Sequence, residues 1–228
     1  MVPNSLFVPR QYGPSRDSVA LDYMEGVKRC IESAKAHAGV AHQLRTLAYE
    51  LGASKNTAGF AVSHAALAEE EAAKAAFCAM VAVELAPPEI LDSALHDHKP
   101  KTYLYHALAR LKILDIKTIG NRTTVTLSGL PIGAEILREL LKADMPELKE
   151  HNADRNAGFY VGKNDSGWMS PGEGCARDPM ALVYQYLLRA QVVLVLCQVL
   201  LRKPMVTLLS NLRIEEANGN WTFTWDEI

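Results

Sequence analysis

The sequence predicts an all-α protein, a bundle of five to seven helices with one small β excursion. Three observations lead to this fold class. Apolar residues recur about every 3.6 positions over the long segment 17–52. Residues 58–86 contain 12 alanines and present no polar face, which predicts a long helix at the centre of the bundle. The apolar segment 178–203 opens with Asp178-Pro179, a favourable N-cap followed by a favourable first helical residue.

The helices of the first half are delimited by capping residues, glycines and prolines. Gly39 interrupts the first apolar pattern and is expected to kink that helix. Three helices are expected here: from a cap at Asp17 or Ser18 to Gly52, from Ser54 or Asn56 to just before Pro87, and from Lys101 to Ile116.

The second half is less regular. Its run of threonine, valine and leucine at 123–127 is β-prone, which favours a short hairpin or an irregular excursion. The expected elements are that excursion at 117–130, a helix from Pro131 to Lys142, a short helical piece after Pro146, a loop over Gly162–Arg177, the final helix to Lys203, and a small strand at Trp221–Trp225.

The composition is that of an ordinary globular protein. The chain has 228 residues, 49% of them hydrophobic, and a net charge of −2. These values exclude a disordered, collagen-like or disulfide-scaffold protein, and no basic excess marks a non-specific nucleic-acid binder. We expect one domain over 1–228, with an N-terminal extension at 1–17 and a C-terminal appendage at 204–228.

Cysteine usage and the apolar segments predict a cytoplasmic protein. The four cysteines lie far apart and form no C-x-x-C pair, as expected for free thiols in a reducing compartment. The first ten residues lack the pattern of a signal peptide. The longest strongly apolar segment, Ala190–Leu201, is about 12 residues long, which is too short to span a bilayer. We therefore expect no contact with a membrane.

Three consecutive glutamates, Glu69, Glu70 and Glu71, interrupt the alanine-rich helix. Successive helical residues advance by about 100°, so the three side chains sweep roughly 200° of the helix surface. On a buried helix at least one carboxylate should then lie inside the protein, where it needs a cation or hydrogen-bond donors. Lys74, three to four residues on, is the nearest candidate. A structural ion pair that sets the helix register explains the pattern without any chemistry.

Two further polar clusters follow. The first is His96-Asp97-His98-Lys99-Pro100-Lys101, which an exposed helix start would also explain. The second is the segment 154–161, in which Arg155 is followed by Asn156 and by a Gly158-Phe159-Tyr160 turn. A plain helix end explains that segment equally well.

In this order, the three clusters resemble the AbiV-type abortive infection proteins of the HEPN superfamily. The family pattern has a Leu-x-x-Glu-Glu-x-x-Lys-Ala run, then His-x-x-Lys, then Arg-x-x-Gly-x-Tyr-Val, then a loop with Trp and Pro before a last apolar helix. The corresponding segments here are Leu67–Ala75, His98–Lys101, Arg155–Val161, and the loop with Trp168 and Pro171. The similarity spans roughly residues 20–203.

The resemblance implies a HEPN-like helical bundle and a role in bacterial defence against phage, in which the infected cell shuts down gene expression. HEPN relatives often cleave RNA without a metal through an Arg-x(4–6)-His motif supplied by both subunits of a homodimer. In this chain Tyr160 occupies the position of that histidine, and no other arginine is followed by histidine at the required spacing.

Candidate site residues follow from the resemblance together with their chemistry. Arg155, with Asn156 beside it, suits the phosphate because its planar guanidinium matches two oxygens. His98 titrates near neutrality and could act as base or acid, and Tyr160 as acid or phosphate donor. Glu70 or Glu71, with Lys74 as the local counter-ion, would orient Arg155 or His98. The site would need no cofactor.

Other classes of function remain open at this point. In a catalytically silent module, Arg155, His98, Lys99 and Lys101 would instead bind RNA or a phage or translation component. A purely structural interaction is a third reading. A metal site is disfavoured because no Glu-x-x-His pair or H-E-x-x-H motif occurs. The apolar final helix predicts a homodimer with a substantial apolar interface.

Overall fold

A computed structural model provides the structure of the protein. It describes residues 16–50, 55–88, 91, 95–96, 98–111, 114–119, 122–127, 153, 155–160, 162–165, 167–173, 175, 178–203, 206–209, 213–217 and 220–226. The described helices are α1 (Arg16–Glu50), α2 (Lys55–Ala82), α4 (His98–Arg110) and α7 (Pro179–Leu201). The strands are β1 (Leu114–Ile119), β2 (Arg122–Leu127), β3 (Gly162–Asn164), β4 (Gly167–Met169), β5 (Arg213–Ala217) and β6 (Asn220–Asp226).

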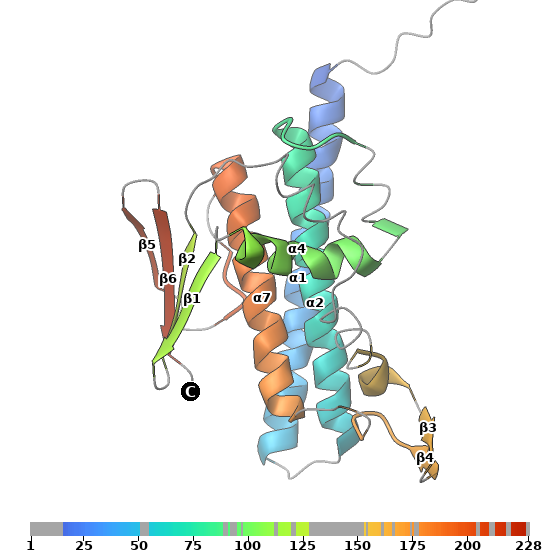
Figure 1. The fold of residues 1–228 in the computed structure, drawn as a ribbon. Helices are drawn as coiled ribbons and strands as arrows, with labels where there is room; N and C mark the ends of the chain where they lie inside the picture. The colour runs from blue at the N-terminus through green and yellow to red at the C-terminus, as the bar shows by residue number, and fades with distance from the viewer. Residues whose placement is uncertain are drawn as a thin grey trace, which may run out of the picture.

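Helix α2 lies at the centre of the bundle, as its alanine content predicts. It packs mainly against α1 and α7, and α4 runs across the bundle (Figure 1). Ten of its alanines are buried: 58, 61, 65, 66, 68, 72, 73, 75, 76 and 79. Small side chains let neighbouring helices approach closely, so the core forms around α2 on every side. The prediction of an all-α bundle with a small β excursion is confirmed.

The expected boundaries are confirmed for α2, which begins at Lys55 and ends before Pro87, and for the start of α7. Asp178 caps α7 by accepting a hydrogen bond from Met180 N at 3.2 Å, with proline at the start of the helix. Helix α1, in contrast, begins at Arg16, so Asp17 and Ser18 lie within it and are not its caps. It continues through Gly39 to Glu50, and Gly52 lies outside the described residues.

Helix α7 is longer than the apolar stretch counted in the sequence. It has 23 residues, and by length and composition it could cross a membrane, although 67% of its most apolar window is buried inside the structure. A core helix meets the same two criteria, so this is a weak indication of a membrane span. Because α7 buries its apolar side chains within the chain, the apolar-surface argument for a dimer loses its basis. The homodimer stays a prediction.

The two buried glutamines of apolar helix α7 bind the chain that follows it. Gln191 Nε2 donates to Val206 O at 3.0 Å, and its Oε1 accepts from Leu208 N at 2.5 Å. Gln198 Oε1 accepts from Val206 N at 2.8 Å. Two buried amides therefore satisfy the backbone of residues 206–208, which is why this core helix tolerates them.

The β structure is more extensive than expected. An antiparallel sheet with the order β1-β2-β6-β5 joins the hairpin after α4 to the C-terminal strands, beside the helical bundle (Figure 1). The expected third helix was therefore too long, because residues 114–116 belong to β1. The expected loop over 162–177 contains the hairpin β3–β4. The helices expected at 131–142 and after Pro146 lie outside the described residues.

Candidate functional site

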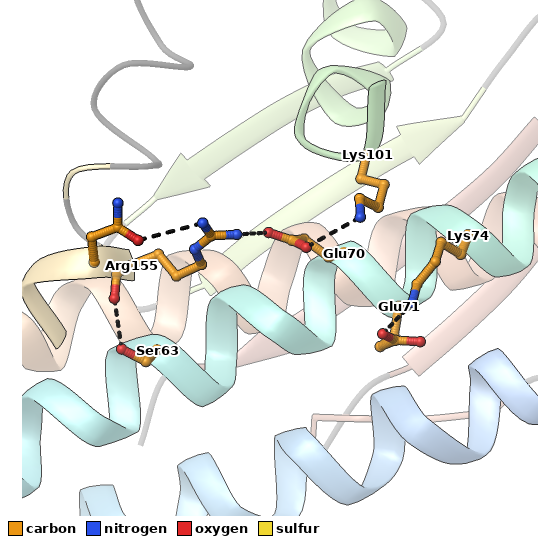
Figure 2. A network of polar contacts seen from close by, with 7 residues as sticks. Ser63, Glu70, Glu71, Lys74, Lys101 and Arg155 are labelled. Carbon is orange, nitrogen blue, oxygen red and sulfur yellow. Dashed lines mark hydrogen bonds and ion pairs between the residues drawn. The ribbon is translucent and has the colours of Figure 1, made fainter. Parts of the chain in front are cut away.

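Of the three consecutive glutamates of α2, Glu70 and Glu71 point to different neighbours. Glu69 is fully buried and Glu70 is 3% exposed, which confirms that at least one carboxylate lies inside the protein. Glu70 points toward Arg155 and α4, whereas Glu71 lies with Lys74 on the side of α2 that faces α1 (Figure 2). The acids therefore belong to separate contacts, as the 100° step between residues requires.

Glu70 is the centre of a buried charge network. Its Oε1 accepts a hydrogen bond from Arg155 Nη1 at 2.7 Å, and its Oε2 lies 3.6 Å from Lys101 Nζ (Figure 2). The side chains of Arg155 and Lys101 are 14% and 5% exposed. One buried carboxylate thus pairs with two cations that come from segments far apart in the chain.

The Arg155 segment is docked on α2 by backbone contacts that need small residues. Ser63 Oγ donates to Arg155 O at 2.9 Å. A Cβ on Gly158 would overlap Ser63 and the Gly59 carbonyl. Gly158 lies in the helical stretch 155–159, so the turn expected at Gly158-Phe159-Tyr160 is wrong. Close packing against α2, and not a turn conformation, is the reason for a glycine at this position.

Gly59 makes a second close approach on the same part of α2. A Cβ placed on Gly59 would lie 2.5 Å from Gly172 N. Gly172 N in turn donates to Ala157 O at 2.7 Å. Gly59 and Gly158 therefore let α2, the Arg155 segment and the loop after β4 meet backbone to backbone.

The remaining predicted site residues are placed as follows. Asn156 is exposed, and its Oδ1 accepts from Arg155 Nη2 at 3.4 Å. Tyr160 is 67% exposed on the same segment. His98 and Lys99 lie in the first turn of α4, but their side chains are outside the described part of the structure.

The structure therefore divides the predicted site in two. Hydrogen bonds and ion pairs link Arg155, Asn156, Glu70 and Lys101, whereas Glu71 and Lys74 pair on a different face of α2. Lys101, which we expected to bind a ligand at the surface, is instead a buried partner of Glu70. The catalytic and binding roles themselves stay predictions.

Sequence reasoning missed a second buried polar cluster. The Arg189 guanidinium of α7 lies over the rings of Tyr105 and Tyr186, 5.3 and 5.5 Å from their centroids. Burial raises the pKa of Tyr105 to about 12, Arg189 lowers it and the charge of Glu69 raises it. The signal in the sequence was Arg189, a lone cation within an apolar helix. A buried cation in such a helix indicates an acid or an aromatic partner on the facing helix.

A pair of histidines was also missed. His37 Nδ1 of α1 and His64 Nδ1 of α2 lie 3.0 Å apart, and the Phe159 ring meets His64 edge-on at 5.7 Å between centroids. The pair thus borders the Arg155 segment. The two residues are 27 positions apart, so no local motif marks them. Within the described residues, no group of three or more His, Cys, Asp or Glu side chains is placed to hold a metal.

Fold and site together define a helical-bundle protein built around an alanine-rich helix with a buried Glu–Arg–Lys network. The chain belongs to the HEPN_AbiV family, whose model, described as AbiV, matches residues 22–186. The match contains all three polar clusters and confirms the resemblance. Membership suggests an abortive-infection, or defence, function. Searches of curated proteins and of solved structures returned no match.

Proposed function

We propose that this protein is an anti-phage abortive-infection effector that stops gene expression by acting on RNA at the Arg155–Tyr160 segment. Membership of the AbiV family supports the defence role. The observation that carries the assignment to this segment is the placement of Arg155. Glu70 of α2 accepts a hydrogen bond from Arg155, and the exposed residues Asn156 and Tyr160 lie on the same short segment.

The segment offers the chemistry that an RNA phosphate requires. Arg155 donates to Glu70 and to Asn156, and its guanidinium carries the charge and planar shape that suit a phosphate. The exposed side chains of Asn156 and Tyr160 add an amide and a hydroxyl that suit phosphate oxygens or base edges. In cleavage, the ribose 2′-OH would give its proton to His98 and bond to the neighbouring phosphorus, and the bond from phosphorus to the 5′-oxygen would break. Arg155 would stabilise the phosphate charge, and Tyr160 would protonate the leaving 5′-oxygen.

A catalytically silent binding module is the second candidate. Two observations favour it: the Arg155 side chain is mostly buried and engaged within the protein, and an exposed tyrosine stands where the Arg-x(4–6)-His motif of ribonuclease relatives in the HEPN superfamily has histidine. Such a protein would bind RNA or a translation component and block it without breaking a bond.

One experiment distinguishes the candidates. Purified full-length protein is incubated with mixed cellular RNA, with and without a chelator, and the RNA is examined by gel and by a filter-binding assay. Cleavage that survives the chelator supports a metal-free nuclease, and salt-sensitive retention without cleavage supports the binding module. If the RNA is neither cleaved nor retained, the proposal that the protein acts on RNA is refuted.

Exposed residues provide variants that leave the core intact. Tyr160→Phe and Asn156→Ala are expected to reduce cleavage or binding at unchanged melting temperature. Tyr49→Phe is the matched control, because Tyr49 is 85% exposed at the end of α1 and loses the same hydroxyl. Equal RNA handling by Tyr160→Phe, Asn156→Ala and Tyr49→Phe would refute the assignment to this segment.

A further inference from the structure

Two cysteines that lie far apart in the sequence meet where α1 packs on α2. Cys30 of α1 is half-buried, whereas Cys78 of α2 is 4% exposed. A hydrogen bond joins the two thiols. A Cβ on Gly26, one helical turn before Cys30, would lie only 3.2 Å from Cys78 Sγ, so the glycine lets the two helices approach closely here. The proposed function uses neither thiol.

The two thiols differ in acidity. The hydrogen bond with Cys78 lowers the pKa of Cys30, and burial opposes this effect. The charges of Glu71 and Lys74, which pair on the side of α2 that faces α1, act on the pKa of Cys30 in opposite directions. The same hydrogen bond, together with burial, raises the pKa of Cys78. Cys30 is therefore the thiol that ionises first, and Cys78 donates the hydrogen bond to it.

The two thiols also differ in access. Cys30 is partly open to solvent and follows the exposed residues Lys28 and Arg29, while Cys78 is enclosed in the core. A thiolate attacks a peroxide oxygen far more readily than a thiol does, so a small hydroperoxide should oxidise Cys30 first. A sulfenic acid formed in this way condenses with a thiol that contacts it. Cys78 is placed to be that thiol.

We propose that Cys30 and Cys78 form a redox-active dithiol, which hydroperoxides oxidise to an intramolecular disulfide between α1 and α2. The Cys30 sulfur donates an electron pair to one oxygen of hydrogen peroxide, and the O–O bond breaks. The other oxygen leaves as hydroxide and takes up the proton lost by Cys30, which gives water and a sulfenic acid on Cys30.

The second step joins the two sulfurs. The Cys78 sulfur bonds to the Cys30 sulfur, the S–O bond breaks, and the departing hydroxide takes the Cys78 proton as a second water. The two thiols lose two electrons in total, and the peroxide gains them. Conversion of Cys30 to a sulfenic acid removes the thiolate that accepts the hydrogen bond from Cys78, so the Cys78 proton is released more easily at this stage.

Oxidation of the purified full-length protein with hydrogen peroxide at pH 7.5 tests the pair. The remaining free thiols are blocked with N-ethylmaleimide, and the digested chain is mapped by mass spectrometry. We expect linked peptides that join Cys30 to Cys78, a fall from four free thiols to two per chain, and reversal by dithiothreitol. The oxidised protein should also melt at a higher temperature, because the disulfide closes the chain between the two helices.

Variants identify the part that each thiol takes. In Cys78→Ser, Cys30 should stop at the sulfenic acid, which dimedone traps, and in Cys30→Ser the enclosed Cys78 should resist the peroxide. The control is Cys175→Ser, because Cys175 is also half-buried but lies in the loop before α7. It should form the disulfide like the unaltered protein.

Peptide mapping of the unaltered protein decides the pairing even where a variant folds poorly. Cys197 of α7 is a third thiol near this contact, and burial raises its pKa to about 12, so it should stay reduced. The proposal is wrong if the peroxide leaves all four thiols free, if Cys30 advances to a sulfinic acid without a link to Cys78, or if the linked peptides join any other pair of cysteines.

Discussion

Replacement of Glu70 by alanine is the most direct test of the buried charge network. The Glu70 carboxylate contacts Arg155 at 2.7 Å and Lys101 at 3.6 Å, and all three side chains are largely buried. Glu70→Ala removes the carboxylate that both cations contact, and arginine cannot shed its charge. Breaking a buried pair in this way costs about 3–5 kcal/mol. For a chain of 228 residues that corresponds to a fall of about 6–20 °C in melting temperature.

Arg155→Ala is expected to cost less than Glu70→Ala, because Lys101 still neutralises the remaining carboxylate. In the double variant the two losses should not add, with a coupling of about 0.5–3 kcal/mol. Calorimetric or circular-dichroism melting of the three variants measures these differences.

The control for Glu70→Ala is Glu25→Ala. Glu25 pairs with Arg29 across one helical turn at 2.9 Å, but both side chains are exposed, so the expected loss is about 0.5 kcal/mol or less. Equal, small shifts for Glu70→Ala and Glu25→Ala would show that the Glu70 network is solvated and that the reasoning is wrong.

Three further predictions concern packing, protonation and thiol reactivity. Gly158→Ala should lower the free energy of unfolding by about 1–3 kcal/mol because its Cβ has no room, whereas Gly39→Ala, in open space, should raise it by about 0.5–1 kcal/mol. Denaturant titration checks both, and equal effects would contradict the close packing. Burial lowers the pKa of His64, so the unfolded chain binds more protons, and stability should fall as the pH drops below about 6.5. Melting at pH 5 and 7.5 should show a smaller difference in His64→Asn. The hydrogen bond with Cys78 lowers the pKa of half-buried Cys30, so iodoacetamide should alkylate Cys30 before buried Cys78, as mass spectrometry would show. The opposite order would refute that contact.

Local chemistry accounts for what could be predicted at the level of elements. The central position of α2 follows from its alanines, and the start of α7 follows from Asp178-Pro179, because both depend on residues within a few positions of one another. The end predicted for the helix over 101–116 was wrong, because residues 114–116 form part of β1 and pair with β2. Pairing between strands is not visible in a local helical pattern.

The candidate site was predictable in its parts, and the family resemblance offered Arg155 as a partner for Glu70 or Glu71, but the contact with Lys101 was not expected. The 100° step between helical residues requires Glu69, Glu70 and Glu71 to diverge, and the sequence alone therefore determined that at least one is buried. It also favoured Lys74, the nearest cation along the chain, as the partner. Lys74 does pair with Glu71, but it lies on the wrong face of α2 for Glu70.

Only the tertiary structure decided that Glu70, and not Glu71, contacts Arg155, and that Lys101 is its second partner. Arg155 and Lys101 reach Glu70 because Gly59 and Gly158 allow close backbone contact and because α4 crosses the bundle. His37 meets His64 across 27 positions for the same kind of reason. Sequence periodicity determines which side of a helix is buried, since that depends on residues a turn apart. Which charges meet inside the protein depends on how separate helices pack, and that is set by contacts between residues distant in the chain.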